Sequence, residues 1–380
     1  MRVMFYVQHL LGIGHIRRAA LLCAAMESRG LEVSVIVGGR DVPGIDFANA
    51  PLIRLPVAHV ADHTFNPLLD ENNEPVDGHW KTARKDKLLS AFRDIGPDVI
   101  VLEMYPFGRR QFRFELEPLL LTAHSAHPRP LIISSIRDIL VNKAKPGRNL
   151  EITDLVRTYF DLVLVHGDQT LIKLDESFHA TPAIADLIRY TGYVAPARTG
   201  SSTTAGSGEV IVSAGGGAVG ATLLNTALAA KEHCQLASKT WRFITGPNMA
   251  EIDLQRLQKQ ASENVIIERF RPDLPHMLGN CELSISQAGY NTIIDLLMGK
   301  ARAIVVPYAD GEESEQLQRA RLLEQRNILM VIKAEELSVS TLIKAINQAI
   351  DAEFDPLDAL DLSGAETTAQ IITAAGRSHG

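Results

Sequence analysis

The chain has 380 residues, which is long for one hydrophobic core and sufficient for two domains. Its net charge of −7 at pH 7 argues against a general nucleic-acid-binding protein, which would normally be basic. No stretch approaches the roughly 20 apolar residues of a membrane span, and the apolar N-terminus is too short for a signal peptide. We therefore expect a cytoplasmic protein with at most peripheral contact with the inner face of a membrane.

The first predicted element is the apolar run Val3–Val7, which is typical of a buried parallel strand. Gly12 and Gly14 then allow a tight turn, and a helical pattern begins at about His15 and continues to Ser28. A glycine-rich turn of this kind brings backbone N–H groups close to a ligand at the positive end of a helix. The same helix end disfavours an imidazolium, so His15 is a candidate base. Alternatively, this is an ordinary turn whose histidine caps the helix.

Short β-branched runs alternate with helical patterns along the rest of the chain, as expected for parallel sheets covered by helices on both faces. The segment 195–208 is small, polar and rich in Gly and Pro, and we expect it to be a linker. It separates an N-terminal domain, 1–194, from a C-terminal domain, 209–355, which is followed by a helix and tail over 356–380. Further strands are expected at Val33–Val37, Val99–Leu102, Leu131–Ser135, Leu162–Val165, Val210–Ser213, Arg242–Thr245, Val265–Glu268, Leu283–Ser286, Ala303–Val306 and Leu329–Ile332. The predicted fold is α/β, with two Rossmann-like, doubly wound parallel-sheet domains facing a cleft.

Polar residues follow three predicted strands of the first domain. Glu103 ends one strand, Arg137 and Asp138 follow the next, and His166 follows a third. Ligands bind at the carboxyl ends of strands in open α/β sheets, so we expect these residues, with Gly12 and Gly14, to line the acceptor side of the cleft. Each can instead be a structural residue whose polar groups are satisfied internally.

The segment from Phe107 to Phe114 interleaves Arg109, Arg110 and Arg113 with aromatic residues. Such a segment can contact an anionic or lipid-linked acceptor. It can also be an amphipathic helix that packs its phenylalanines inward.

A second glycine loop, Ser213-Ala-Gly-Gly-Gly-Ala-Val-Gly220, directly follows a predicted strand. Four glycines in eight positions lose much entropy on ordering, which a phosphate-binding role for Ser213, Gly215, Gly216 and Gly217 would explain. The spacing matches neither the dinucleotide-binding fingerprint nor the Walker A motif, which argues against nicotinamide cofactors and ATPase chemistry.

A third group of residues follows the strand Leu283–Ser286. The chain turns at Gly289, and Asn291, Thr292 and Asp295 share one face near the start of a helix. A carboxylate there can bind a ribose diol, or it can simply complement the helix dipole. Glu315 and Gln316 enter the next helix and can face the same cleft or be solvated.

No metal site is expected. The three cysteines lie far apart, and no carboxylate at ligand spacing accompanies His124 and His127. An Asp-x-Asp motif beside a strand is also absent.

The segment from Val210 to about Glu336 resembles the C-terminal donor-binding domain of glycosyltransferase family 28. That family includes the bacterial enzyme that adds N-acetylglucosamine to the peptidoglycan lipid precursor. In the family, the residue at Asp295 is usually Glu and binds the ribose, and the pair at Glu315-Gln316 is usually Gln-Gln and contacts the donor sugar. The backbone near Phe270 and Arg271 would meet the base, which is uracil in most relatives. The matching residues are Ser213–Gly220, Phe270–Pro272, Ala288–Thr292, Asp295, Gly299, Val306-Pro307, Glu315-Gln316 and Ala320.

Two further resemblances concern the first half. The run Gly12–Arg18 is similar to the opening of the UDP-sugar hydrolase of nonulosonate biosynthesis, whose matching histidine is the base. The chain as a whole, including Pro106–Phe112, resembles a bacterial group of predicted glycosyltransferases.

These resemblances imply an inverting glycosyltransferase of the GT-B superfamily that needs no cofactor or metal. The donor would be a nucleoside-diphosphate sugar, expected to be a UDP-sugar, on the C-terminal domain. The acceptor, a glycan or a lipid-linked molecule, would enter from the N-terminal domain, where His15 removes its proton. Alternatives are a UDP-sugar hydrolase or epimerase on the same fold, and a non-catalytic nucleotide-sugar-binding protein in which His15 is dispensable.

Overall fold

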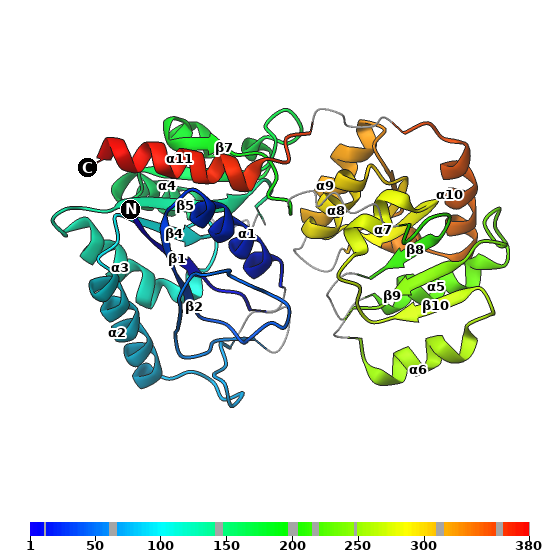
Figure 1. The fold of residues 1–380 in the computed structure, drawn as a ribbon, viewed down its shortest axis with the longest axis horizontal. Helices are drawn as coiled ribbons and strands as arrows, with labels where there is room; N and C mark the ends of the chain where they lie inside the picture. Colours follow the sequence, from blue (N-terminus) through cyan, green and yellow to red (C-terminus); the bar gives the residue numbers. More distant parts are fainter. Residues whose placement is uncertain are drawn as a thin grey trace. The chain divides into compact units, whose positions relative to one another are not determined.

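The computed structural model of the chain (Figure 1) describes residues 1–10, 13–60, 67–140, 147–196, 204–214, 220–246, 249–308, 315–354 and 360–379. The chain divides into two compact units. The N-terminal unit comprises Met1–Pro196 together with Asp361–Gly380, and the C-terminal unit comprises Ala197–Leu360. No helix within the described ranges is long and apolar enough to cross a membrane.

The N-terminal unit is built on a parallel sheet, and the described part of the chain gives it seven strands in the order β3-β2-β1-β4-β5-β6-β7. Strand β1 has β2 on one side and β4 on the other, so the strand order reverses there. In open α/β sheets a ligand binds at the carboxyl ends of strands at such a reversal. The strands are β1 (Arg2–Val7), β2 (Glu32–Val37), β3 (Leu52–Arg54), β4 (Val99–Glu103), β5 (Leu131–Arg137), β6 (Leu162–His166) and β7 (Ile188–Tyr190).

Both faces of this sheet are buried, as the apolar strands predict. Val3, Phe5 and Val7 of β1 join the cluster formed with α1 and α11, while Met4 and Tyr6 join the cluster formed with α2 and α3. This alternation follows from the two-residue period of a strand. The helices of the unit are α1 (Gly14–Ser28), α2 (Gly78–Ile95), α3 (Arg113–His124), α4 (Arg148–Tyr159) and α11 (Gly364–His379), with short 3₁₀ helices at Arg110–Phe112, Leu174–Glu176 and Thr181–Leu187.

The C-terminal helix α11 belongs to the N-terminal unit, although the sequence analysis treats it as a separate tail. It lies beside α1 (Figure 1, red and blue), and its buried Ala369 and Ile372 enter the same apolar cluster. Glu366 accepts a hydrogen bond from Arg29 Nε at 2.7 Å. The chain therefore passes into the C-terminal unit and returns.

The C-terminal unit contains a second parallel sheet, with six strands in the described residues in the order β10-β9-β8-β11-β12-β13. The order reverses at β8, and Ser213 at the end of β8 is in register with Ser286 of β11. The strands are β8 (Val210–Ser213), β9 (Trp241–Ile244), β10 (Val265–Glu268), β11 (Leu283–Gln287), β12 (Ala303–Val306) and β13 (Met330–Val331). The helices are α5 (Ala221–Lys231), α6 (Glu251–Gln260), α7 (Leu274–Asn280), α8 (Tyr290–Gly299), α9 (Glu315–Gln325) and α10 (Val339–Asp351), with a 3₁₀ turn at Ala334–Glu336.

The predicted strands are all present within a residue or two of their expected ends. Strands β3 and β7 are not among the predicted strands. Each has three residues, lies at an edge of the sheet and has no fully buried side chain. A strand that short and exposed carries no apolar run by which it could be recognised.

Candidate functional site

His15 and Glu103 form a hydrogen-bonded pair at the strand reversal of the N-terminal sheet. His15 is the second residue of α1, and the buried Glu103 is the last residue of β4. His15 Nδ1 lies 2.6 Å from Glu103 Oε1, and Arg18 Nη2 lies 2.6 Å from the same oxygen. A carboxylate at Nδ1 orients the imidazole and leaves Nε2 with a lone pair. This arrangement suits a general base.

The charges around the pair favour a neutral His15 beside an ionised Glu103. Burial lowers the pKa of His15 below its ordinary value; Glu103 opposes this shift, and Arg109 and Arg137 add to it. Burial alone would raise the pKa of Glu103, but the interaction with His15 and the charges of Arg109 and Arg18 outweigh it and hold that pKa well below its usual range. His15 can therefore accept a proton at neutral pH.

Arg109 also reaches this site. It follows β4 in the left-handed backbone conformation, with φ 58° and ψ 25°. Its Nη2 lies 3.5 Å from Glu103 Oε2. In the sequence, Arg109 stands out only as one of three arginines among aromatic residues. Its position a few residues after a strand that ends in the candidate carboxylate Glu103 is the sequence feature that could have indicated this role.

His166 and Asp138 lie in the interior of the N-terminal unit and do not line an open surface. His166 Nε2 is 2.7 Å from Ser135 Oγ, and its Nδ1 is 2.9 Å from Thr191 Oγ1. Burial, together with the charge of Arg18, lowers the pKa of His166 to about 3. Asp138 accepts a hydrogen bond from the Tyr193 hydroxyl at 3.0 Å. Protein groups therefore hold both side chains, and their expected role on the acceptor side stays a prediction.

The remaining expected residues of the acceptor side are Gly12, Gly14 and Arg137. Gly12 lies outside the described residues, and Gly14 is the first residue of α1. Arg137 ends β5, opposite His166 of β6, and is half-buried. Its charge acts on both His15 and Arg109.

A second candidate site lies at the strand reversal of the C-terminal sheet. Ser213 is buried at the end of β8, while Gly215, Gly216 and Gly217 lie outside the described residues. A Cβ at Gly220 would clash with that of Ala214, so the two ends of the glycine segment approach closely. Glycine is required at this contact, whatever the segment binds.

Helix α8 follows β11, the strand that pairs with β8. Gly289 is its N-cap, Asn291 and Thr292 are half-buried in its first turn, and Asp295 follows, nearly buried, one turn later. The predicted face of Asn291, Thr292 and Asp295 therefore exists on a helix that starts at the carboxyl end of β11.

Glu315 and Gln316 are the first residues of α9 and are held by protein groups. Glu315 pairs with Arg319 at 2.9 Å, and Arg319 lies over the ring of Tyr290. Gln316 Oε1 accepts a hydrogen bond from the backbone N–H of Tyr308 at 3.0 Å. The negative charge of Glu315 is thus balanced within the unit.

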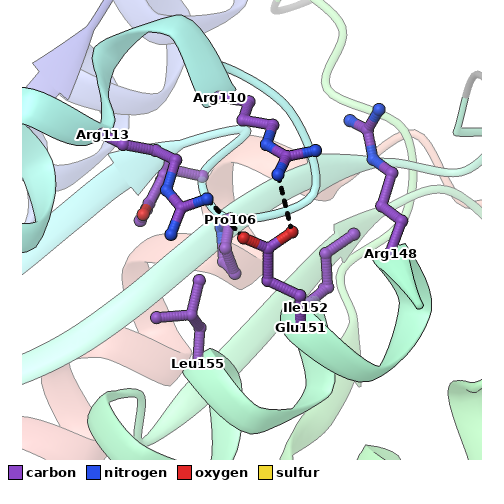
Figure 2. Close-up of a pocket in the computed structure, with 8 residues that line it drawn as sticks. Pro106, Arg110, Arg113, Arg148, Glu151, Ile152 and Leu155 are labelled. Carbon is purple, nitrogen blue, oxygen red and sulfur yellow. Dashed lines mark hydrogen bonds and ion pairs between the residues drawn. The ribbon is translucent and has the colours of Figure 1, made fainter. Parts of the chain in front are cut away.

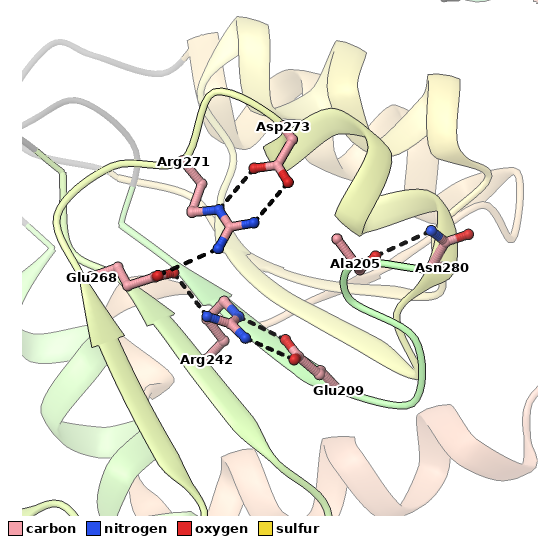
Figure 3. A network of polar contacts seen from close by, with 7 residues as sticks. All are labelled: Ala205, Glu209, Arg242, Glu268, Arg271, Asp273 and Asn280. Atoms are coloured by element: carbon pink, nitrogen blue, oxygen red, sulfur yellow. Dashed lines mark hydrogen bonds and ion pairs between the residues drawn. The ribbon is translucent and has the colours of Figure 1, made fainter. Parts of the chain in front are cut away.

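The side chains of Phe270 and Arg271 have different surroundings. Phe270 follows β10 with 66% of its surface exposed. Arg271 donates to Asp273 at 2.8 and 2.7 Å, and it reaches Glu268 in the ion-pair network of Figure 3. That network continues through Arg242 to Glu209, so the Arg271 guanidinium is held by ion pairs of the sheet. The ring of Phe270 remains accessible.

A shallow pocket on the N-terminal unit lies beside Pro106 (Figure 2). Arg110 and Arg113 both contact Glu151 there, and Arg148 lies nearby. Its volume of about 10 Å³ has room for no more than one water molecule. Within the described ranges, no group of three His, Cys, Asp or Glu side chains is placed to hold a metal ion.

Residues 211–360 match the family model of the glycosyltransferase family 28 C-terminal domain. Over these residues the C-terminal unit is similar to a family 28 glycosyltransferase domain. The matched range covers the segment from β8 through α10, and so contains Ser213, the α8 face and Glu315-Gln316.

Curated relatives match part of the chain. A UDP-N-acetylglucosamine–N-acetylmuramyl-(pentapeptide) pyrophosphoryl-undecaprenol N-acetylglucosamine transferase of Exiguobacterium sp. is 31% identical over 109 residues, which cover 29% of this chain and 30% of the relative. The protein of the same name from Bacillus licheniformis is 26% identical over 197 residues, 49% of this chain and 53% of the relative. The chain thus spans about half or less of the length of these relatives.

Solved structures resemble the whole chain. Acinetobacter baumannii MurG has a TM-score of 0.62 at 12% identity, covering 98% of this chain and all of that one. The glycotransferase of kitacinnamycin has a TM-score of 0.64 at 13% identity, with 100% and 97% covered. The rhamnosyltransferase SpnG in complex with thymidine diphosphate has a TM-score of 0.60 at 17% identity, with 98% and 96% covered. The predicted GT-B fold, with two Rossmann-like domains, is confirmed.

Proposed function

We propose that this chain is an inverting glycosyltransferase that moves a sugar from a nucleoside-diphosphate sugar to an acceptor hydroxyl. The observation that carries the proposal is the pair of His15 and Glu103 at the strand reversal of one Rossmann-like unit, in a chain whose other unit is similar to a family 28 domain. A base on one unit and a donor domain in the other are the two parts that such a transfer needs.

The proposed reaction is a single displacement. The acceptor oxygen bonds to the anomeric carbon while the bond from that carbon to the diphosphate breaks, so the configuration inverts. His15 Nε2 takes the acceptor proton, and Glu103 stabilises the imidazolium that forms. The nucleoside diphosphate leaves with the electron pair.

We place the donor on the C-terminal unit. Asp295 would accept hydrogen bonds from the ribose, the glycine segment 215–217 would receive the diphosphate, and Gln316 would lie near the sugar. The exposed ring of Phe270 and the backbone beside it would meet the base. The names of the curated relatives favour a UDP-sugar and a lipid-linked acceptor. The SpnG complex makes thymidine diphosphate the first alternative nucleotide.

The first test is nucleotide binding by calorimetry. UDP should bind with a dissociation constant between micromolar and millimolar, about −8 to −4 kcal/mol. Asp295→Ala should weaken binding by about 1.5–3 kcal/mol, the scale of a hydrogen bond to a charged group. Glu263→Ala, which removes the same charge from an exposed position of the same unit, should leave binding unchanged. Tighter binding of NAD or ATP than of any nucleoside diphosphate would contradict the assignment.

The second test is UDP release from UDP-sugars with and without acceptors, followed by mass spectrometry of the product. A transferase must exclude water until the acceptor is bound, so release should be slow alone and strongly stimulated by lipid-linked sugars or oligosaccharides. Fast production of free sugar with no acceptor effect would identify a UDP-sugar hydrolase instead.

A further inference from the structure

Buried polar atoms without a hydrogen-bond partner gather beside His15. Within the described residues they include Nε of Arg109 and Nδ1 of His9, while Nη2 of Arg109 and Oε2 of Glu103 face each other at 3.5 Å without a hydrogen bond. Glu103 ends β4, His9 lies two residues after the end of β1, and Arg109 lies six residues after the end of β4. Buried polar groups normally find partners because leaving them unpaired is unfavourable, so such a cluster indicates a site for a polar ligand.

Positively charged side chains gather at this cluster. Arg18 and Arg109 both reach Glu103, and the charge of Arg137 acts on His15 and Arg109. Burial lowers the pKa of Arg109; the charge of Glu103 opposes this shift, and the positive charges of Arg137 and Arg18 add to it. An anion at this position would favour the charged form of Arg109 and offset the repulsion from the neighbouring arginines.

The backbone of Arg109 points to the same conclusion. A residue other than glycine rarely adopts its left-handed conformation, and such strained residues cluster at ligand sites. The conformation separates two neighbouring arginines: Arg109 is nearly buried beside Glu103, while Arg110 is exposed and pairs with Glu151 at 3.3 Å (Figure 2).

We propose that Arg109, supported by Arg137, binds a phosphate or carboxylate group of the acceptor close to the hydroxyl that His15 deprotonates. The acceptor would then be a phosphorylated or acidic molecule and not a neutral one. This inference rests on the proposed function. It assigns the anion to the acceptor because Arg109 shares a unit and a carboxylate with the base, whereas the donor domain is the other unit.

The test uses inorganic phosphate as the probe, the full chain, and constant ionic strength. Phosphate is titrated into UDP-saturated protein by calorimetry. Arg109→Gln should weaken phosphate binding by about tenfold or more, the scale of a lost charge-assisted hydrogen bond, with UDP affinity unchanged. Arg110→Gln removes the same charge one residue further along and should change phosphate binding less than about twofold. Equal losses in the two variants would mean diffuse attraction and would overturn the proposal.

Two further readouts separate the remaining outcomes. If saturating UDP abolishes phosphate binding, or if Arg109→Gln weakens UDP itself, the anion belongs to the donor diphosphate and the acceptor assignment is wrong. If Arg109→Gln fails to fold, the wild type and Arg109→Lys are compared by NMR. In labelled wild-type protein, phosphate should shift the ring resonances of His15 but not those of the exposed His179. The Arg109→Lys variant should retain the His15 shift. No His15 shift in the wild type would also overturn the proposal.

The His15 resonance test does not depend on UDP. If the chain binds no nucleoside diphosphate, the proposed function is wrong. The His15 resonance shift would still decide whether Arg109 forms an anion site.

Discussion

His15 and Glu103 are 88 residues apart in the chain, yet their side chains meet at 2.6 Å. The meeting depends on the parallel pairing of β1 with β4, which brings the start of α1 beside the end of β4. Arg18, one helical turn after His15, reaches the same carboxylate. The local spacing in α1 and the long-range pairing of the sheet together build the candidate base.

His15→Ala should lower turnover by about 100- to 10,000-fold, the usual contribution of a general base. UDP affinity should change little because the proposed donor site lies in the other unit. His179→Ala, which removes an exposed histidine of the same unit, is the matched control. Near-normal turnover of the His15 variant, measured by UDP release with acceptor, would favour a non-catalytic nucleotide-sugar-binding protein.

The pH dependence should reveal the lowered pKa of His15. The base must be neutral to act, so activity is lost only as the pH falls through its pKa. Burial and the nearby arginines hold that pKa below the ordinary value of about 6.5, so kcat/KM should stay nearly flat from about pH 7.5 down to about pH 6. A half-maximal rate at about pH 6.5, if it disappears with the His15 substitution, would show an unshifted histidine and contradict the electrostatic account.

At the scale of elements, a buried ion pair joins helices α2 and α3 to the sheet. Arg84 of α2 donates from Nε to Glu115 Oε2 of α3 at 2.7 Å, and the Tyr6 hydroxyl of β1 donates to Glu115 Oε1 at 2.5 Å. Both charged side chains are fully buried. The Arg84 guanidinium also lies over the rings of Trp80 and Phe112.

Glu115→Ala should lower the free energy of unfolding by about 3–5 kcal/mol, because it leaves the Arg84 charge buried and unpaired. Replacing both partners with apolar residues, Arg84→Met with Glu115→Leu, should recover much of that loss. Urea denaturation measures both effects. Asp186→Ala breaks an exposed pair with Arg157 and should have little effect. A double variant no more stable than Glu115→Ala would show that the pair itself is required.

For the whole molecule, the return of the chain makes its C-terminus a structural part of the N-terminal unit. Ile372 of α11 is fully buried in the cluster that includes β1 and α1, whereas its neighbour Ile371 is only partly buried. The stability of the first unit therefore depends on residues that follow the second unit in the sequence.

Ile372→Ala should destabilise the N-terminal unit by about 2–5 kcal/mol through lost burial and the cavity left behind. Ile371→Ala should cost less, and neither change should alter UDP binding. The chain has two tryptophans, Trp80 in the N-terminal unit and Trp241 in the C-terminal unit. Trp80 fluorescence in a Trp241→Phe background therefore reports the first unit alone. Equal losses for the two isoleucines would contradict the packing of α11.

The sequence by itself determined the features that depend on local pattern. Continuous apolar runs between helical patterns indicated parallel strands, because a strand buried on both faces has no polar positions. The glycine loop after Val210–Ser213, the helix bearing Asp295 and the histidine at the start of α1 were likewise visible, because each lies within a few residues of a strand end. The edge strands β3 and β7 could not be predicted, because their side chains are not fully buried and their sequences therefore contain no apolar run.

Only the tertiary structure decided which residues meet. Strand order gave His15 the partner Glu103, and it turned His166 inward to Ser135 and Thr191. The left-handed backbone at Arg109, and not its residue type, separated it from Arg110. Docking on α1 placed the last helix in the first unit. The physical reason is the same in each case: contacts between distant residues depend on the pairing and packing of whole elements, which short-range periodicity does not specify.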